Sequence, residues 1–265
     1  MTISNIIILS ILQGLTEFLP VSSSGHLVAI PKILGLPDQG LTMDLAVHIG
    51  TLLAVLLYYI KDLLLIAKSL IFWKNKSLDQ SRKLGIYIGF ATVPSVIFGF
   101  IMHEILPEGI RDVRVIIANL IIFGIIMIIA DKFFKEEKDL SKITFKSAMI
   151  IGVAQVLALI PGTSRSGVTI SASRILGFNR TDAAKFSFLL SIPSVAGAGL
   201  IGVLDFMKSG SDASLGVDML LAVAMSFLAG LAAISIMMRF LKNLGLVPFA
   251  IYRILLAVAL IIFII

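Results

Sequence analysis

The second half of the chain contains the stretch Pro161-Gly162-Thr163-Ser164-Arg165-Ser166-Gly167-Val168-Thr169, which surrounds an arginine with hydroxyl groups. It follows an apolar run, residues 148–160, that is too short to cross a bilayer. Arginine at membrane depth is costly and usually faces a cavity or a partner, and its planar fork of donors suits phosphate oxygens. We interpret the stretch as a phosphate site sunk into a membrane protein. The alternative is a surface loop with a snorkelling Arg165.

The composition places the chain among membrane proteins with several helical spans. Hydrophobic residues make up 58% of its 265 residues and charged residues 14%, a balance that soluble domains do not show. Cysteine is absent, so disulfides and thiolate chemistry are excluded. The net charge of +6 is expected to set topology rather than to bind nucleic acid. Residues 1–5 lack a basic side chain, so we expect no cleavable signal peptide.

Six apolar segments are predicted to span the bilayer as helices: residues 43–60, 84–102, 115–130, 186–204, 218–238 and 247–265. A polar loop is expected after residue 60, because several lysines follow it. Two further apolar regions, 6–30 and 147 to about 173, are interrupted by polar residues. We predict that they form re-entrant helix hairpins, whose irregular backbone must be covered by protein or line a cavity. The predicted fold class is an all-α polytopic membrane protein.

The two halves of the chain are predicted to be inverted repeats within a single membrane domain, residues 1–265. A shift of 142 residues aligns Gln13 with Gln155, Leu15 with Leu157, Ser22 with Ser164, Ser24 with Ser166 and Gly25 with Gly167. Residues 1–131 and 147–265 then each contain one hairpin and three spans, which inverts the second half. Paired broken segments in inverted halves indicate a site at the membrane midplane. Small residues matched only for close helix packing are the alternative.

A second internal similarity occurs at a different shift. It relates Val93-Pro94-Ser95-Val96 to Ile192-Pro193-Ser194-Val195, and we interpret it as chance.

The positions of the basic segments predict the membrane topology. Basic segments come after residues 60, 130 and 238, and we expect them, including the charged linker 132–146, to be cytoplasmic. The first hairpin would then open outward and the second inward, with both termini outside.

Glu17 is the acid of the first hairpin, and Gln13 lies on the same helical face four residues earlier. An unpaired carboxylate is costly at membrane depth, so Arg165 of the second hairpin is its expected partner. The pair could be a structural link between the halves. In the other interpretation, Glu17 positions a metal ion or a proton while Arg165 holds phosphate.

The break in the first hairpin contains Ser22, Ser23, Ser24, Gly25 and His26. One serine is expected to cap the following helix. Ser23 and His26 are three residues apart at a helix start, which would let the imidazole act as base for a serine nucleophile. A buried core histidine is the alternative. His48 and Asp44, on the first span, are expected to make core contacts, and the alternative is that they line the same cavity. Together the two hairpins offer groups that suit cleavage of a phosphoanhydride.

Two motifs carry a family resemblance: Gln13-Gly14-Leu15-Thr16-Glu17-Phe18-Leu19-Pro20-Val21-Ser22-Ser23-Ser24-Gly25-His26 and the stretch 161–169. Together, and with residues 186–190 and 248–253, they resemble the undecaprenyl-diphosphatase family, also called bacitracin resistance proteins, over the whole chain. The resemblance implies a bacterial membrane hydrolase with inverted repeats and two re-entrant helix pairs. Such an enzyme converts undecaprenyl diphosphate to undecaprenyl phosphate and inorganic phosphate. This recycles the lipid carrier of peptidoglycan synthesis, and overproduction confers bacitracin resistance.

The resemblance also implies roles for individual residues. The implied catalytic residues are Glu17, Ser23, His26 and Arg165, and the implied phosphate-binding residues are Ser22, Ser24, Ser164, Arg165, Ser166 and Thr169. A divalent cation, Mg²⁺ or Ca²⁺, is implied, with Glu17 and Gln13 as ligands, although Gln13 adds no negative charge where some members have glutamate. The expected partners are the polyprenyl diphosphate lipid, the bilayer and a second copy in a homodimer. The expected location is the bacterial cell membrane, with the active site facing the outer side.

Two mechanisms are open at this point. Ser23 attacks phosphorus with help from His26 or Glu17, or an activated water attacks directly while Ser23 only binds. A different function is also open, because inverted repeats with broken helices are typical of transporters: the protein could move a polyprenyl phosphate lipid across the bilayer.

Overall fold

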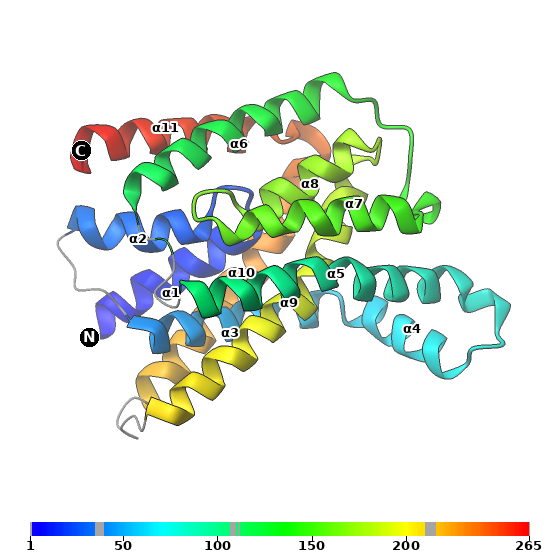
Figure 1. Cartoon of the computed structure of the whole chain (residues 1–265), viewed down its shortest axis with the longest axis horizontal. Coiled ribbons are helices and arrows are strands. Elements are labelled where there is room, and N and C mark those ends of the chain that lie inside the picture. The colour runs from blue at the N-terminus through cyan, green and yellow to red at the C-terminus, as the bar shows by residue number, and fades with distance from the viewer. Residues whose placement is uncertain (1, 35–39, 107–109, 111, 210–215, 265) are drawn as a thin grey trace.

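The computed structural model describes residues 2–34, 40–106, 110, 112–209 and 216–264, and its regular elements are helices (Figure 1). The α-helices are α1 (Ile3–Phe18), α2 (Ser23–Leu34), α3 (Gly40–Tyr58), α4 (Ile60–Ile71), α5 (Asp79–Ile105), α6 (Val113–Phe133), α7 (Phe145–Val156), α8 (Arg165–Ile175), α9 (Arg180–Ser209), α10 (Gly216–Leu244) and α11 (Val247–Ile264). Short 3-10 helices add η1 (Lys76–Leu78), η2 (Leu140–Lys142) and η3 (Leu157–Leu159). The prediction of an all-α fold is confirmed.

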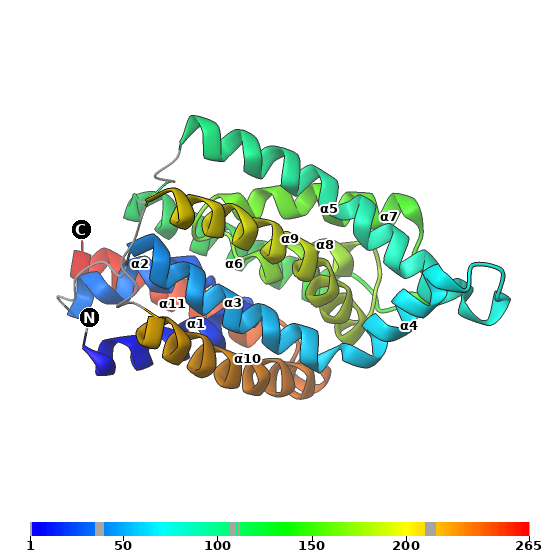
Figure 2. The ribbon, with the colours of Figure 1, turned by 90° about the horizontal axis from the view of Figure 1, so that it is seen from below.

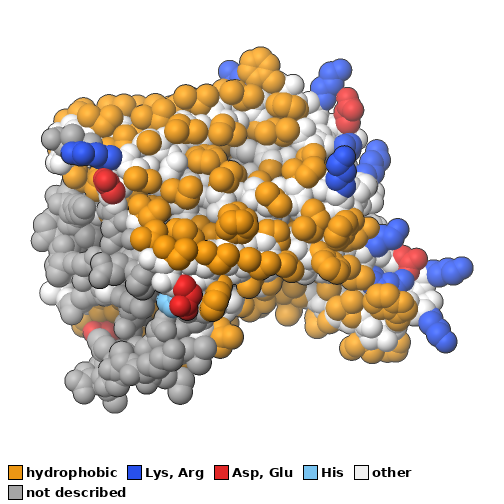
Figure 3. All heavy atoms as spheres, in the orientation of Figure 1, with side chains coloured by type: hydrophobic (Ala, Val, Ile, Leu, Met, Phe, Trp, Pro, Cys, Tyr) orange, Lys and Arg blue, Asp and Glu red, His pale blue; other side chains and the backbone are white. Residues whose placement is uncertain are grey.

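Five of the described helical segments are long and apolar enough to cross a membrane: η1 with α5, α6, the first part of α9, α10 and α11. Helices α3 and α4 together would be a sixth, but the chain bends by 74° between them. Large apolar side chains such as Leu200, Leu228 and Ile262 are exposed, and Figure 3 shows apolar side chains covering the face between the two ends of the molecule. Such a surface suits lipid. The chain is a multi-pass membrane protein, as predicted.

The segment after residue 60, predicted as a polar loop, is a helix. In α4, Leu63 and Ile66 pack against the core, while Lys61 and Lys68 are exposed. The lysines therefore occupy the outer face of an amphipathic helix, and a reading of charge alone missed the helical spacing of the apolar residues between them. The predicted spans match helices: α11 begins where its span was predicted to begin, and the other five extend a few residues further at one or both ends.

Two helical hairpins meet in the middle of the molecule. Helices α1 and α2 enter from one end, α7 and α8 enter from the other, and Figure 1 shows both turns near the centre. The Ser166 hydroxyl of the second hairpin donates to the Leu19 carbonyl of the first, with 3.1 Å between the oxygens. The start of α1 and the end of α11 lie at the same end of the molecule, whereas Lys and Arg side chains gather at the other end in Figure 3.

The helices around the hairpins contact one another in matching sets. Helix α1 packs on α10 as α7 packs on α5, and α3 packs on α10 as α9 packs on α5. Helix α6 packs on α11, and α3 packs on α9, so that α3 lies between α9 and α10 (Figure 2). These contacts enclose the two hairpin turns.

The two Pro-Ser segments, whose similarity we interpret from sequence as chance, meet in space. Ser95 of α5 and Ser194 of α9 each accept a hydrogen bond from Gln155 Nε2 of α7, at 2.9 Å. Amide and hydroxyl groups within a bundle can bond helices together where water is absent. The repeated Pro-Ser pair therefore has a structural role that its different shift in the sequence did not indicate.

Glycines bring helices into backbone contact. A Cβ atom on Gly152 of α7 would lie 2.7 Å from the Ala91 Cα of α5, and a Cβ on Gly14 of α1 would lie 2.7 Å from the Ser226 carbonyl oxygen of α10. Real Cβ atoms do not approach other atoms so closely. Both close approaches therefore depend on glycine, as is common between membrane helices.

The variant Gly152→Ala is expected to destabilise the protein by about 1–3 kcal/mol, because the new methyl group must displace the backbone of α5. Gly89→Ala in α5 is the matched control, since nothing lies within 4 Å of a Cβ there and alanine favours a helix. Thermal unfolding in detergent should show a lower Tm for the first variant only. Equal Tm values in the two variants would contradict the packing at Gly152.

Candidate active site

Both hairpins turn through a serine in the left-handed backbone region. Ser22 has a φ of 74° and Ser164 a φ of 70°, and in the described part of the chain every other positive φ belongs to glycine. Each Oγ accepts the N–H of the glycine three residues later, Gly25 at 3.3 Å and Gly167 at 3.2 Å. Such a backbone costs about 1–3 kcal/mol and persists where its surroundings hold it, often at functional sites. Helices α2 and α8 thus each begin directly after a capping serine.

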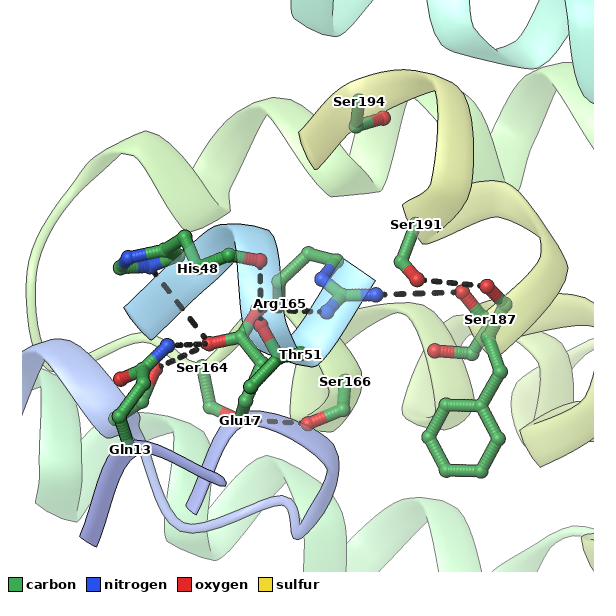
Figure 4. Close-up of polar contacts among 12 residues, drawn as sticks. Gln13, Glu17, His48, Thr51, Ser164, Arg165, Ser166, Ser187, Ser191 and Ser194 are labelled. Atoms are coloured by element: carbon green, nitrogen blue, oxygen red, sulfur yellow. Dashed lines mark hydrogen bonds and ion pairs between the residues drawn. The ribbon is translucent and has the colours of Figure 1, made fainter. Parts of the chain in front are cut away.

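The carboxylate of Glu17, near the end of α1, is the meeting point of the site (Figure 4). Its Oε1 accepts a hydrogen bond from Arg165 Nη2 at 2.9 Å. Its Oε2 accepts hydrogen bonds from Ser23 Oγ at 2.7 Å and from Gln13 Nε2 at 2.9 Å. The side chains of Glu17 and Arg165 are 9% and 13% exposed, so this ion pair is largely withdrawn from solvent. The structure therefore joins the predicted acid, hydroxyl and guanidinium.

Two helix starts converge on the same carboxylate. Ser23 is the first residue of α2 and Arg165 the first residue of α8, and both side chains bond Glu17. The first N–H groups of a helix lack intrahelical partners, and the helix dipole places about half a positive charge there. Two helix starts and a guanidinium outweigh the single negative charge of Glu17. The site can therefore bind a further anion, and phosphate suits such groups.

The hydroxyl groups beside Arg165 are bonded within the protein. Thr169 Oγ1 donates to the Arg165 carbonyl at 2.8 Å and lies 2.6 Å from Ser187 Oγ of α9. The Ser187 carbonyl in turn lies 3.5 Å from Arg165 Nη1. Thr169 and Ser187 thus hold the arginine side chain and the first turn of α8. Sequence reasoning missed Ser187, although it lies in the segment 186–190 that carries part of the resemblance.

The remaining predicted phosphate-binding hydroxyls differ in exposure. Ser22, Ser164 and Ser166 are buried, and the Oγ atoms of Ser164 and Ser166 lie 3.3 Å apart. Ser24 is exposed, with its Oγ 3.3 Å from that of Ser22. The buried hydroxyls shape the two turns in this structure, whereas Ser24 is open to a ligand.

The structure does not pair His26 with Ser23. The His26 Nε2 atom lies 2.7 Å from Tyr252 Oη of α11, and the two rings are stacked with 5.7 Å between their centroids. Its Nδ1 lies 2.7 Å from the Ser22 carbonyl one turn earlier. Side chains in a helix point back toward its N-terminus, which brings this ring against Ser22 rather than against the Ser23 hydroxyl. Glu17, not His26, accepts the hydrogen bond from the Ser23 hydroxyl here.

His48 lies beside the site, as in the alternative interpretation, and does not make the core contact that the sequence favoured. Its side chain is 36% exposed, and its Nε2 lies 3.9 Å from Glu17 Oε2. The Nδ1 atom lies 2.7 Å from the Asp44 carbonyl one turn earlier, which directs the other nitrogen toward the carboxylate. An ionisable side chain on an apolar span usually faces a functional cavity, which is the basis of that alternative.

Two oxygen groups of the site fit a divalent cation. Gln13 is fully buried, and its Oε1 has no hydrogen-bond partner in the described part of the chain, although its Nε2 bonds Glu17. Carboxylate and amide oxygens suit Mg²⁺ and Ca²⁺, and Mg²⁺ often takes one or two protein carboxylates together with substrate phosphates. The described residues contain no group of three or more His, Cys, Asp or Glu that could hold a metal. A cation held by Gln13 and Glu17 would therefore need further oxygen ligands, which phosphate could supply.

Comparison with known proteins gives matches over nearly the whole chain. Residues 6–259 match the family model described as bacitracin resistance protein BacA. A protein of Alcanivorax borkumensis is 44% identical over 255 residues, 96% of each chain. A protein of Teredinibacter turnerae is 43% identical over 267 residues, 98% of each chain. A protein of Alteromonas mediterranea is 44% identical over 268 residues, 100% of this chain and 99% of the relative. All three relatives are named undecaprenyl-diphosphatase.

Proposed function

The chain belongs to the family of bacitracin resistance protein BacA, and we propose that it hydrolyses undecaprenyl diphosphate to undecaprenyl phosphate and inorganic phosphate. Family membership, predicted from the two motifs, is confirmed. The proposal rests on one observation: Ser23 and Arg165, from the two different hairpins, both hydrogen-bond the Glu17 carboxylate. The reaction recycles the lipid carrier of cell-wall synthesis. It also removes the diphosphate lipid that bacitracin binds, which accounts for resistance.

In the first step, the diphosphate lies between the two hairpin turns with its terminal phosphate at Arg165 and at the starts of α2 and α8. The guanidinium and the helix N–H groups donate to the phosphate oxygens. Ser23 Oγ attacks the terminal phosphorus, and its proton passes to Glu17, whose Oε2 already accepts it at 2.7 Å. The bond from phosphorus to the bridging oxygen breaks, undecaprenyl phosphate leaves, and a phosphoserine remains. Glu17 then releases the proton to solvent.

In the second step, water attacks the phosphoserine. Glu17 takes a proton from this water and returns it to Ser23 Oγ as the bond between Oγ and phosphorus breaks, which releases inorganic phosphate. Direct attack by a water activated by Glu17 uses the same groups in one step and forms no phosphoserine. In both routes Arg165 stabilises the charge that develops on the phosphoryl oxygens.

We propose Mg²⁺ or Ca²⁺ as the cofactor, with Glu17 and Gln13 Oε1 as its protein ligands. When bound, the ion neutralises charge on the diphosphate. The variant Gln13→Ala is expected to weaken Mg²⁺ binding by about 10-fold, the lower end of what loss of a supporting ligand costs. The readouts are the Mg²⁺ concentration for half-maximal phosphate release and, without substrate, the rise of Tm with added Mg²⁺.

Gln155→Ala is the matched control for Gln13→Ala, because Gln155 occupies the corresponding position in α7 and bonds Ser95 and Ser194. It should leave the Mg²⁺ dependence unchanged. If both variants and the wild type respond to Mg²⁺ alike, Gln13 is not a ligand. A chelator that leaves phosphate release unchanged would remove the cofactor proposal altogether.

The proposed membrane architecture has six spans and two re-entrant hairpins in inverted halves, residues 1–131 and 147–265. Matched packing of α1 on α10 and of α7 on α5 supports the repeat, as do the matched serine turns at Ser22 and Ser164. Basic side chains gather at the end opposite the termini, which supports a cytoplasmic face there, with the linker 132–146 on it. We propose that the protein resides in the bacterial cell membrane and that the site opens to the outer side.

Phosphate release by purified protein tests the function. In detergent, without sealed vesicles, the wild type is expected to release inorganic phosphate from undecaprenyl diphosphate or a shorter polyprenyl diphosphate, and Glu17→Ala should not. A flippase, the alternative function, requires a sealed bilayer and releases no phosphate. Lipid transfer between the leaflets of vesicles, with no phosphate release in detergent, would overturn the proposal.

A further inference from the structure

Arg253 is a buried cation on an otherwise apolar helix. It lies in α11, one of the helices that are apolar enough to span a membrane, and it is 0% exposed. Five of its acceptors are backbone carbonyls: Gly162 at 2.7 Å and Asn119 at 3.1 Å from Nη2, Thr163 at 2.9 Å and Pro20 at 3.4 Å from Nη1, and Leu120 at 3.4 Å from Nε. Met127 Sδ, 3.7 Å from Nη1, is a side-chain acceptor. Burial of a guanidinium inside a membrane protein is costly, so a charge placed there indicates a function.

The acceptor carbonyls belong to both turns of the site. Gly162 and Thr163 come directly before the capping serine that precedes Arg165, and Pro20 lies three residues before Ser23. The two remaining acceptor carbonyls belong to α6. One guanidinium therefore bonds the two turns to each other and to α6 and α11, a few residues before Ser23 and Arg165, which both bond Glu17.

The turns are fitted closely around this guanidinium. A Cβ atom on Gly167, in the first turn of α8, would lie 2.9 Å from Arg253 Nη1. Gly162 has a φ of +87°, and a Cβ there would lie 2.6 Å from the Ile116 carbonyl oxygen. Glycine at position 167 leaves room for the guanidinium, and glycine at position 162 lets the turn adopt its positive φ and pack against α6. The neighbouring residue Tyr252 bonds His26, so the same turn of α11 also holds another of the four predicted catalytic side chains.

We propose that Arg253 is the positioning residue that keeps Ser23 and Arg165 on one carboxylate. It touches neither the reacting hydroxyl nor the proposed phosphate position, and it acts through the backbone of both turns. The inference rests on the proposed hydrolysis and adds to it a residue outside both hairpins. Lysine cannot replace arginine here, because a single ammonium group cannot reproduce a planar fork that reaches acceptors on three segments.

Arg174 provides a matched control. It is also buried, at 1% exposed, and it also donates to backbone carbonyls, Phe178 at 2.7 Å and Phe134 at 2.9 Å. It differs in that it also forms ion pairs with Asp131 and Glu136, each at 3.6 Å. It also lies at the other end of α8 from Arg165. Arg174→Lys therefore measures what a buried arginine contributes to stability alone, without an effect on the site.

The experiment compares kcat, KM and Tm for Arg253→Lys and Arg174→Lys in detergent. Both variants are expected to lower Tm. Arg253→Lys should also lower kcat by about 100-fold, the cost of a small misplacement of reacting groups, with little change in KM. Arg174→Lys should keep kcat near the wild-type value. If Arg253→Lys keeps wild-type kcat, or if both variants lose kcat equally, the positioning role is wrong.

Two further measurements separate this inference from the proposed function. In a Ser23→Ala background, Arg253→Lys should lower kcat by a much smaller factor than in the wild type, because the effects of residues that act through one another do not add. A full additional loss would contradict action through Ser23. If the wild type releases no phosphate, the proposed hydrolysis is wrong. The positioning role is then tested by the rise of Tm on addition of inorganic phosphate. This rise should persist in Arg174→Lys and be lost in Arg253→Lys; its persistence in both would overturn the positioning role.

Discussion

Arg165→Ala is expected to lower kcat/KM for phosphate release by about 10³- to 10⁵-fold, the range found for arginines that stabilise phosphoryl transfer. Arg165 is the first residue of α8 and the cation that faces the Glu17 carboxylate at 2.9 Å. Its loss removes the donors for the phosphate oxygens and leaves a negative charge in their place. The ion pair is largely buried, so Tm is expected to fall as well.

Two companion variants define what Arg165 contributes. Arg165→Lys retains the charge but not the planar fork, so its loss of kcat/KM should be smaller than that of alanine but still large. Arg239→Ala removes an exposed arginine on α10 and should leave kcat/KM unchanged. If folded Arg165→Ala protein hydrolyses the diphosphate within about tenfold of the wild type, electrostatic stabilisation by Arg165 is not the basis of catalysis.

The pairing of Glu17 with Arg165 could be predicted from sequence, because each is an ionisable group in a broken apolar segment and each would be costly alone. The hairpin turns could be located for the same reason: polar and glycine-rich stretches interrupt segments too short to span. The free-energy cost of an unpaired ionisable group inside the membrane thus predicts which groups must have partners. It does not fix which partner each group finds when several lie within one helical turn.

His26 illustrates that limit. Spacing places it one turn from Ser23, but the ring is held by Tyr252, which is 226 residues away in the chain. Arg253 illustrates a second limit, because most of its acceptors are backbone carbonyls, which no pattern of side chains in the sequence can predict. For α4, the sequence contained the helical spacing of apolar residues, and the lysines between them led to the prediction of a loop.

Ser23→Ala should lower kcat by about 10³-fold or more if serine is the nucleophile, since an activated nucleophile has no substitute within the site. Glu17→Gln should cause a loss of about 10²- to 10⁴-fold, the usual contribution of a general base. The double variant should be little worse than the worse single variant, because the two residues act as one unit. His26→Gln should lower kcat far less, because the Ser23 hydroxyl donates its hydrogen bond to Glu17 and not to His26.

The hydrogen bond from Ser23 to Glu17 leads us to expect the covalent route, and a rapid-quench experiment tests it. Protein mixed with a β-³²P-labelled polyprenyl diphosphate and stopped in acid within one turnover should carry label on Ser23, and His26→Gln should carry it too. Ser23→Ala should carry none. If the wild type carries no label while Ser23→Ala keeps most of its kcat, water attacks phosphorus directly. Glu17 would then serve as base for that water, and Ser23 would only bind the substrate.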